Sequence, residues 1–386
     1  MLRRLGRGKA PGPDGVPNEV LRCMPPEFHR SLHRLMRLCW AEGHVPDRWK
    51  ESHTVLLYKK GDPAAVGNYR PIGLLNTVYK LYTAMITDVL AEYAEARGML
   101  SEGQEGFRQA RTTARQLQVL TGVIEDSRDR GTDLLVLYVD FVNAFGSVDH
   151  RRLLATMRLL GVPEDCLAVV RDLYQGASTA YSTPHGWTAQ VPFVGRGTVQ
   201  GDTLSPLLFI LCLEPLLRWL DEGTRGYSFG QPGERIASLA YADDLAVLTG
   251  GLTDMRAQVW KLERFCEWSG MEVNVTGKDK TALTGALRRA DASERAALRN
   301  MQFQTVRYDS DEVLYEREGE WVRTYRTIPY IPPEGTYTYL GVHVTLTGSF
   351  AKHLTCLLGK VRAKGKLIAD SPLTVNQKLR IIRMVL

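Results

Sequence analysis

Three aspartates stand at the ends of short apolar runs that are typical of buried β-strands. Asp140 directly follows the run 134–139, and Asp243 and Asp244 form the link between two later runs. Neighbouring strands lie ~4.8 Å apart, so carboxylates at their ends can share one or two divalent ions. The pattern therefore allows a metal site built from Asp140 and Asp243.

The same residues also have a purely structural interpretation. Asp-Asp is a common turn dipeptide, and Asp140 can cap the segment that follows it. Taken alone, the residues support this interpretation and the metal site equally. As a ligand, Asp243 is favoured over Asp244, because consecutive strand side chains point to opposite faces and only the turn relaxes this rule.

Apolar periodicity predicts the elements that would position these acids. A strand at 54–58, a turn at 59–63 and a returning strand at 69–72 form a hairpin with basic residues near its tip. A second strand pair is expected over 337–344, whereas residues 286–336 have no clear pattern. Helices are expected over 18–43 (two, interrupted by prolines), 78–97, 112–130, 151–160, 163–174, 206–220 and 253–269, and from about 351 and 374.

Composition excludes several classes of protein. The chain has 386 residues, of which 44% are hydrophobic and 24% charged, so a disordered tail or a collagen-like fibre is ruled out. The net charge of +6 mildly favours an anionic partner without identifying one.

The sequence predicts no membrane partner and no export. The longest apolar stretch, 204–213, is far shorter than the ~20 residues of a membrane-spanning helix, and the basic start lacks the apolar region of a signal peptide. The six cysteines are scattered, which argues against a zinc knuckle or a disulfide framework. We expect an intracellular protein, in the nucleus or the cytoplasm, with reduced thiols.

Several motifs occur in a fixed order around the aspartates. Three segments resemble the central motifs of reverse transcriptases: 139–145 (Val-Asp-Phe-Val-Asn-Ala-Phe), 196–206 (Arg-Gly-Thr-Val-Gln-Gly-Asp-Thr-Leu-Ser-Pro) and 240–244 (Ala-Tyr-Ala-Asp-Asp). Three more resemble the fingers motifs of non-LTR (LINE-type) retrotransposon enzymes: 8–15 (Gly-Lys-Ala-Pro-Gly-Pro-Asp-Gly), 68–72 (Asn-Tyr-Arg-Pro-Ile) and 104–108 (Gln-Glu-Gly-Phe-Arg). The resemblance runs from about residue 5 to residue 344.

The resemblance implies a right-hand polymerase of the α+β class, with helical fingers, an antiparallel-sheet palm and a partial thumb. It also implies domain boundaries along the chain. These are fingers 1–133, palm 134–285 with a fingers-associated segment at about 151–195, an uncertain insertion 286–336, a palm primer-grip hairpin 337–349, and a partial thumb 350–386.

By the same resemblance, the aspartates would be the catalytic groups. Asp140 and Asp243 would hold two Mg²⁺ ions, for which Mn²⁺ can substitute, with Asp244 beside them and the main-chain carbonyl of Phe141 as a further ligand. One ion would lower the pKa of the primer 3′-hydroxyl, and the other would neutralise the triphosphate. The implied partners are an RNA template, a DNA primer and dNTPs.

Basic residues would bind the phosphates of the incoming nucleotide. The resemblance places Lys59 or Lys60, together with Arg70, where the family grips the triphosphate, and Lys280 near the leaving pyrophosphate. Lys278 is an alternative to Lys280. A solvated basic turn is the competing interpretation, and it suits Lys59 better than Arg70, which precedes a proline in an apolar segment.

Gln200 and Gly201 would lie against the templating base and the incoming nucleotide. Glycine permits close backbone approach, and the amide can both donate and accept hydrogen bonds. The competing interpretation is a loop in which Asp202 or Ser205 caps the apolar helix that follows. Both interpretations can hold together.

Two further segments would contact the nucleotide and the primer. Phe145 matches the bulky residue under the incoming sugar, and Leu340 and Gly341 match the hairpin that holds the primer terminus. The alternatives are that Phe145 packs in the core and that 339–342 is an ordinary core strand.

The chain departs from the family where Gly146 replaces the usual aspartate. This change is expected to loosen the start of the following helix, although Asp149 can supply an acid there. The chain begins inside the first fingers motif and stops in what resembles the early thumb, as expected of a fragment or a decayed copy. The main alternative function is therefore a catalytically weak or dead remnant that binds RNA or RNA–DNA hybrid. An RNA-templated RNA polymerase fits the fingers motifs poorly.

Overall fold

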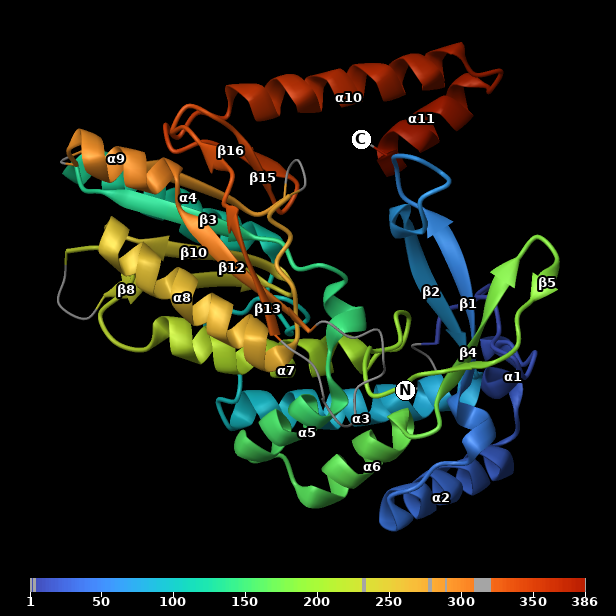
Figure 1. The fold of residues 1–386 in the computed structure, drawn as a ribbon. Coiled ribbons are helices and arrows are strands. Elements are labelled where there is room, and N and C mark those ends of the chain that lie inside the picture. Colours follow the sequence, from blue (N-terminus) through green and yellow to red (C-terminus); the bar gives the residue numbers. More distant parts are fainter. Residues whose placement is uncertain are drawn as a thin grey trace.

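Two five-stranded β-sheets, on opposite sides of the molecule in Figure 1, organise the chain. The computed structural model describes residue 2 and residues 5–230, 234–276, 280–288, 290–308 and 321–385. Helices pack between and around the sheets, so the α+β class predicted from the sequence is confirmed. No helix in these ranges is both long and apolar enough to cross a membrane.

The first sheet is built on the hairpin predicted near residue 60. β1 (Glu51–Tyr58) pairs antiparallel with β2 (Tyr69–Leu75), and β4 (Ser178–Thr183) joins β1 in parallel. β5 (Gly186–Trp187) and β6 (Val191–Pro192) pair with β4. The sequence does not predict β4, because the segment Ser-Thr-Ala-Tyr-Ser-Thr has no apolar run and its partner is distant in the chain.

Two helices precede this sheet, as the break at the two prolines predicts. They are α1 (Asn18–Cys23) and α2 (Pro26–Glu42). α2 ends at Gly43, whose φ of 62° is left-handed and costs glycine little.

The second sheet carries the aspartates. Its strands follow the order β14 (Tyr330–Ile331), β11 (Ala282–Ala286), β3 (Leu134–Val139), β10 (Asp244–Thr249) and β9 (Ser238–Tyr241). All neighbours are antiparallel except β14 and β11. Every residue of β3 is buried, as expected of an apolar run that is covered on both faces.

Alternate residues of β3 enter two different hydrophobic cores. Leu137 belongs to the larger core, which the apolar sides of several helices complete, and Tyr138 belongs to a smaller core on the other face. The larger core includes residues of α3 (Thr77–Ala96), α5 (His150–Leu159), α6 (Glu164–Tyr174), α7 (Ser205–Asp221) and α8 (Leu252–Ser269). The smaller core includes residues of α4 (Thr113–Arg130), β15 (Tyr337–Tyr339) and β16 (Val342–Val344).

Regular structure also occurs where the sequence pattern is unclear. Within 286–336 the chain forms α9 (Ala292–Arg299) and the hairpin of β12 (Gln302–Tyr308) and β13 (Trp321–Thr327). β12 contacts α8, where the Gln304 backbone N–H donates to Glu263 Oε1 at 2.6 Å. A short ribbon of β7 (Tyr227–Ser228) and β8 (Arg235–Ile236) precedes β9.

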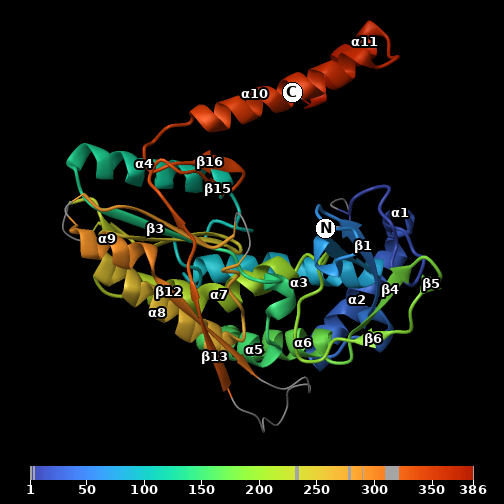
Figure 2. The same ribbon diagram turned by 45° about the horizontal axis from the view of Figure 1, so that its top comes forward.

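The two predicted C-terminal helices are present. α10 (Ala351–Asp370) and α11 (Val375–Val385) follow β16 and extend away from the second sheet (Figure 2). No residue of α10 is buried, and the apolar residues Leu354, Leu358 and Leu367 are among its exposed side chains.

Candidate active site

The pairing of β10 with β3 brings the three aspartates to one end of the second sheet. Leu245 pairs with Val139, so Asp244 and Asp140 are the next residues of the two antiparallel strands. Asp243 occupies the turn between β9 and β10, where Ala242 has a left-handed φ of 58°. β3 and β10, which are distant in the sequence, lie side by side (Figure 1). The aspartates at their ends therefore meet at one end of the sheet, as the strand-end pattern predicts.

The three carboxylates lie within electrostatic reach of one another. Burial raises the pKa of Asp243, and the charge of Asp140 raises it further, whereas Arg70 and Lys280 lower it. Part of the Asp244 side chain is exposed to solvent, yet burial of the rest, followed by the charges of Asp243 and Asp140, raises its pKa to about 6. Charged carboxylates at this edge therefore repel one another, and a cation would relieve the repulsion.

Asp140 is fixed by the segment that precedes β11. Its backbone N–H donates to Thr281 Oγ1 at 3.0 Å, and its carbonyl accepts from the Asn274 N–H at 2.8 Å. Lys280 Nζ donates to Asp140 Oδ1 at 3.1 Å, so the predicted phosphate-binding lysine lies at the carboxylates. Lys278 lies outside the described residues.

Arg70 lies on β2 of the first sheet, within electrostatic reach of the same carboxylates. It is exposed on β2, opposite Leu57, and its charge lowers the pKa of Asp243 across the space between the sheets. Lys59 and Lys60 are exposed in the turn that follows β1. Within the described ranges none of these three cations forms an ion pair.

The hairpin tip is held by bonds within the hairpin itself. Tyr58 Oη donates to the Gly61 carbonyl at 2.6 Å, and Tyr69 Oη donates to the Pro63 carbonyl at 2.9 Å. The two tyrosine rings lie 5.5 Å apart, centroid to centroid. The lysines thus stand on an ordered turn.

Gln200 and Gly201 lie against the backbone of β2. The Gly73 N–H donates to the Gln200 carbonyl at 2.6 Å, and a Cβ on Gly201 would stand 2.7 Å from the Gly73 carbonyl oxygen. Gly201 also has a left-handed φ of 114°. The close approach that requires glycine is therefore to the first sheet of this chain.

The alternative in which Asp202 or Ser205 caps α7 holds only in part, because the Asp202 carboxylate accepts backbone hydrogen bonds from Thr203 and Leu204 directly before the helix. α7 begins at Ser205, and its N-cap residue Leu204 makes no side-chain cap. Asp202 is buried and accepts a hydrogen bond of 2.5 Å from Thr83 Oγ1 on α3. Burial raises its pKa to about 6. Asp202 also links the loop to α3.

Phe145 has contacts that fit both interpretations of its role. It lies half-buried in a 3₁₀ turn, Ala144–Ser147, and stacks on the buried Phe209 with a centroid separation of 4.7 Å. Its other neighbour is Phe107, edge-on at 6.3 Å and half exposed. One side of the ring thus packs in the core, and a partly open aromatic pair lies on the other.

Gly146 lies in the 3₁₀ turn and not in the following helix. A Cβ on Gly146 would stand 2.2 Å from Nδ2 of the exposed Asn143 side chain, so a larger residue would require Asn143 to change rotamer. α5 begins at His150, and Asp149 caps it by accepting the Arg152 N–H at 3.0 Å. The expectation that Gly146 loosens this helix is therefore wrong, and the suggested role of Asp149 is confirmed.

The predicted primer-grip hairpin covers the face of the second sheet opposite α7. Tyr337 stacks on Tyr138 with a centroid separation of 3.9 Å, and Tyr339 Oη donates to the Leu239 carbonyl at 3.3 Å. Leu340 and Gly341, with φ of 48° and 81°, form the turn between β15 and β16. The alternative of an ordinary core strand therefore describes Tyr337 and Tyr339. It does not describe Leu340 and Gly341, which lie in the turn.

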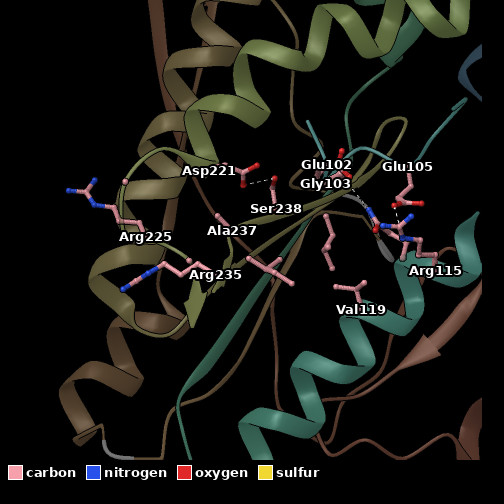
Figure 3. Close-up of a pocket in the computed structure, with 15 residues that line it drawn as sticks. Glu102, Gly103, Glu105, Arg115, Val119, Asp221, Arg225, Arg235, Ala237 and Ser238 are labelled. Atoms are coloured by element: carbon pink, nitrogen blue, oxygen red, sulfur yellow. Dashed lines mark hydrogen bonds and ion pairs between the residues drawn. The ribbon is translucent and has the colours of Figure 1, made fainter. Parts of the chain in front are cut away.

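A cavity of about 340 Å³ lies on the outer side of β9 (Figure 3). Its lining includes Asp221 and Ser238, whose hydroxyl donates to Asp221 at 3.1 Å, and the ion pair between Arg115 and Glu105. Burial raises the pKa of Asp221 to about 6. None of the three catalytic candidates lines this cavity, so it is distinct from the cluster of aspartates.

No group of three or more His, Cys, Asp and Glu side chains among the described residues is arranged to hold a metal ion. An ion at this edge would therefore need ligands besides side chains. Sequence patterns assign no role in the site to Thr281 or Gln104. Thr281 accepts from the backbone N–H of Asp140, and Gln104 accepts from that of Ala242, next to Asp243. For Gln104 the only signal was its place in the motif 104–108.

Known proteins match this chain over the region that contains most of these motifs. Residues 57–344 match the family model described as reverse transcriptase (RNA-dependent DNA polymerase). The Pol polyprotein from the type-1 retrotransposable element R2 of Popillia japonica is 28% identical over 376 residues, which are 97% of this chain and 47% of that protein. The RNA-directed DNA polymerase from the mobile element jockey of Drosophila melanogaster is 26% identical over 250 residues, 64% of this chain and 26% of that protein.

Other matches are more partial. An uncharacterized 149 kDa protein of transposon TX1 from Xenopus laevis is 28% identical over 74% of this chain and 22% of that protein. Apo telomerase from Candida tropicalis, truncated from its C-terminal domain, aligns with a TM-score of 0.45 at 12% identity, over 71% of this chain and 57% of that chain.

The chain spans less than half the length of each of these three curated relatives. The family model, in contrast, covers the second sheet, all three aspartates and the first sheet except most of β1. The predicted resemblance to non-LTR retrotransposon enzymes is confirmed by the R2 and jockey matches. The chain therefore belongs to the reverse transcriptase (RNA-dependent DNA polymerase) family, in the branch found in non-LTR retrotransposons.

Proposed function

We propose that the chain extends the 3′-hydroxyl of a DNA primer with dNTPs on an RNA template, as part of a retrotransposon protein. The observation that carries this proposal is that Asp140 and Asp243 meet at one end of the second sheet, within electrostatic reach of Arg70 on the first sheet. Negative groups for metal and a positive group for phosphate then face the same space. This arrangement suits nucleotidyl transfer.

The residues present fit a magnesium site. Mg²⁺ prefers oxygen ligands, is bound through one or two carboxylates, and completes its shell with waters and substrate phosphates, so a three-acid cage is not needed. Asp140 and Asp243 would hold the ions, with Asp244 beside them and the Phe141 carbonyl as a further ligand. When bound, Mg²⁺ or Mn²⁺ lowers the pKa of the attacking hydroxyl and neutralises the triphosphate.

The basic groups of the site would bind the nucleotide. Arg70 would bind the triphosphate through its forked guanidinium, with Lys59 or Lys60 as a more mobile second contact. Lys280 now pairs with Asp140 at 3.1 Å, and in the complex it would donate to the leaving pyrophosphate. Phe145 would exclude a ribonucleotide 2′-hydroxyl.

The remaining assignments follow from the same family. Residues 1–133 would act as fingers, 134–285 as palm and 350–386 as part of a thumb. Gln200 and Gly201 would lie near the templating base, and Leu340 and Gly341 near the primer terminus. An intracellular site of action, in the nucleus or the cytoplasm, accords with this role.

Primer extension on an RNA template tests the proposal. The purified chain should add dNTPs to an annealed DNA primer in Mg²⁺ and should discriminate against NTPs. Hybrid binding without any extension, in either Mg²⁺ or Mn²⁺, would support the alternative of a catalytically dead remnant. Preferred use of NTPs would instead indicate an RNA polymerase.

A further inference from the structure

The segment 103–108 lies along the outer edge of β9, the strand that leads to the catalytic turn. The Ala240 N–H donates to the Gly103 carbonyl at 2.8 Å, and the Glu105 N–H donates to the Ala240 carbonyl at 2.8 Å. β9 is the last strand of its sheet, so this segment takes up the hydrogen bonds of an otherwise free edge.

Within this segment, Gln104 bonds to Ala242, the residue that directly precedes Asp243. Its Oε1 accepts the N–H of Ala242 at 2.8 Å, and its Nε2 donates to the Ala242 carbonyl at 3.3 Å. The same Oε1 accepts the N–H of Gly106 at 2.8 Å. The side chain is completely buried, so these bonds do not compete with water.

Ala242 needs such support because of its conformation. Its φ of 58° is left-handed, which costs a residue with a Cβ of order 1 kcal/mol, and it directly precedes Asp243. Gly106 is packed against the same residue, since a Cβ there would stand 2.2 Å from the Ala242 nitrogen. The position of Asp243 thus depends on a turn that Gln104 and Gly106 hold from outside.

The supporting segment is itself anchored. Arg108 is buried and pairs with both carboxylate oxygens of Glu95 on α3 at 2.7 Å, and its Nη1 donates to the carbonyls of Ser101 and Gln104. On the other side, Glu105 pairs with Arg111 and Arg115 (Figure 3 shows Glu105 and Arg115). Gln104 therefore projects from a rigid base, as a positioning group requires.

We infer that Gln104 is a positioning residue that holds Asp243 in the geometry needed to bind metal. This inference rests on the proposed function, because it concerns the same site. Gln104 does not touch the reacting atoms and acts through the Ala242 peptide groups. Outer-shell residues of this kind typically alter metal affinity or activity by about 10–100-fold.

Gln116 provides a matched control. It is also buried beside β9, and its Nε2 donates to the carbonyls of Gly103 and Ala240, both at 2.9 Å. It thus makes the same kind of contact with the same edge and does not bond to Ala242. Gln104→Met and Gln116→Met each remove a buried amide of similar size, and only the first frees the turn.

The test compares the two variants in single-turnover extension at varied Mg²⁺ and in Mn²⁺ binding by electron paramagnetic resonance. Gln104→Met should lower the extension rate about tenfold or more, raise the Mg²⁺ concentration for half-maximal rate, and weaken Mn²⁺ binding. Gln116→Met should lower only the melting temperature. Gln104→Glu keeps the oxygen that accepts from the Ala242 N–H, so it should change the extension rate and the metal affinity less. This variant replaces Gln104→Met in the test if Gln104→Met does not fold.

Equal Mg²⁺ dependence and Mn²⁺ affinity in folded Gln104 and Gln116 variants would overturn the inference. A wild-type protein that binds Mn²⁺ without extending a primer would contradict the proposed function alone, and Mn²⁺ affinity would still decide the role of Gln104. A wild-type protein that binds no Mn²⁺ would overturn both.

Discussion

The two sides of the site differ in how firmly they are held. The carboxylates stand at the ends of buried strands. Thr281, in the segment before β11, fixes Asp140, and Gln104 fixes the turn that carries Asp243. The cations stand on an exposed hairpin whose tip is ordered by bonds within the hairpin, such as that of Tyr58 with Gly61. Metal ligands need fixed geometry, whereas residues that close on a charged substrate need room to move. Changes near the carboxylates of the second sheet should therefore affect the chemical step, and changes on the β1–β2 hairpin should affect substrate binding.

The largest effect should follow loss of a metal ligand. Asp140→Asn removes a carboxylate from the fixed side of the site, so its extension rate should fall by more than the ~100-fold that outer-shell changes cost. Asp244→Asn should cost less, because that side chain is partly exposed. Single-turnover extension measures both, and equal losses would show that the two acids are equivalent ligands.

Changes on the hairpin should act on nucleotide binding. Arg70→Ala should raise the KM for dNTPs about tenfold with a smaller change in kcat, because a forked phosphate contact is lost. Lys59→Ala is the control at the tip and should change KM less. If Arg70→Ala lowers only kcat, the residue belongs functionally with the fixed side.

Phe145 tests how the site chooses between deoxyribose and ribose. Phe145→Val should improve NTP use relative to dNTP use by at least about tenfold, or ~1.4 kcal/mol, because a smaller side chain admits the 2′-hydroxyl. Its stacking on Phe209 predicts a loss of stability as well, which thermal unfolding measures. Unchanged discrimination in a folded, active variant would leave Phe145 with a core role only.

The raised pKa values predict a pH-dependent response to metal. Asp244 has a folded pKa of about 6 against an ordinary value of 3.8, so without metal its contribution to stability falls as pH rises through that window. Mg²⁺ binds the ionised form, so the rise in melting temperature that it causes should grow from pH 5 to pH 7. A Mg²⁺ effect that is independent of pH, or equally large in Asp140→Asn, would contradict this linkage.

The smallest effect concerns Gly146. Gly146→Ala should lower stability by less than about 1 kcal/mol, because its Cβ would stand 2.2 Å from the exposed Asn143 side chain, which must then change rotamer. Asn143→Gly, at a residue with a left-handed φ of 45°, should remove most of that cost in the double variant. Thermal unfolding of the two single variants and the double variant measures the coupling. Additive changes would contradict the steric explanation.

Local patterns predicted the parts of the fold that local chemistry decides. The apolar run 134–139 forms β3 with the predicted bounds, and the helices next to the site begin and end near their predicted residues. The strand β4 escaped prediction because its polar sequence forms a strand only beside β1, a long-range partner. The hairpin of β12 and β13 escaped it because charged residues interrupt both strands.

The site shows the same division between local and long-range information. Strand ends and motif order predicted the aspartates, and the structure brings them together. The role of Gln104 was not predictable, because it depends on contact with Ala242, 138 residues further along the chain. The steric reason for Gly146 was likewise hidden, since it depends on the rotamer of Asn143.

The central claim is that Asp140 and Asp243 jointly hold the metal that synthesis requires. A Mg²⁺ titration of RNA-templated primer extension, by the wild-type chain and by Asp243→Asn, tests it most directly, with hybrid binding measured in parallel. The wild type should extend the primer only with Mg²⁺ or Mn²⁺, and the variant should bind the hybrid equally well and add no nucleotide. Substantial Mg²⁺-dependent synthesis by Asp243→Asn would contradict the account.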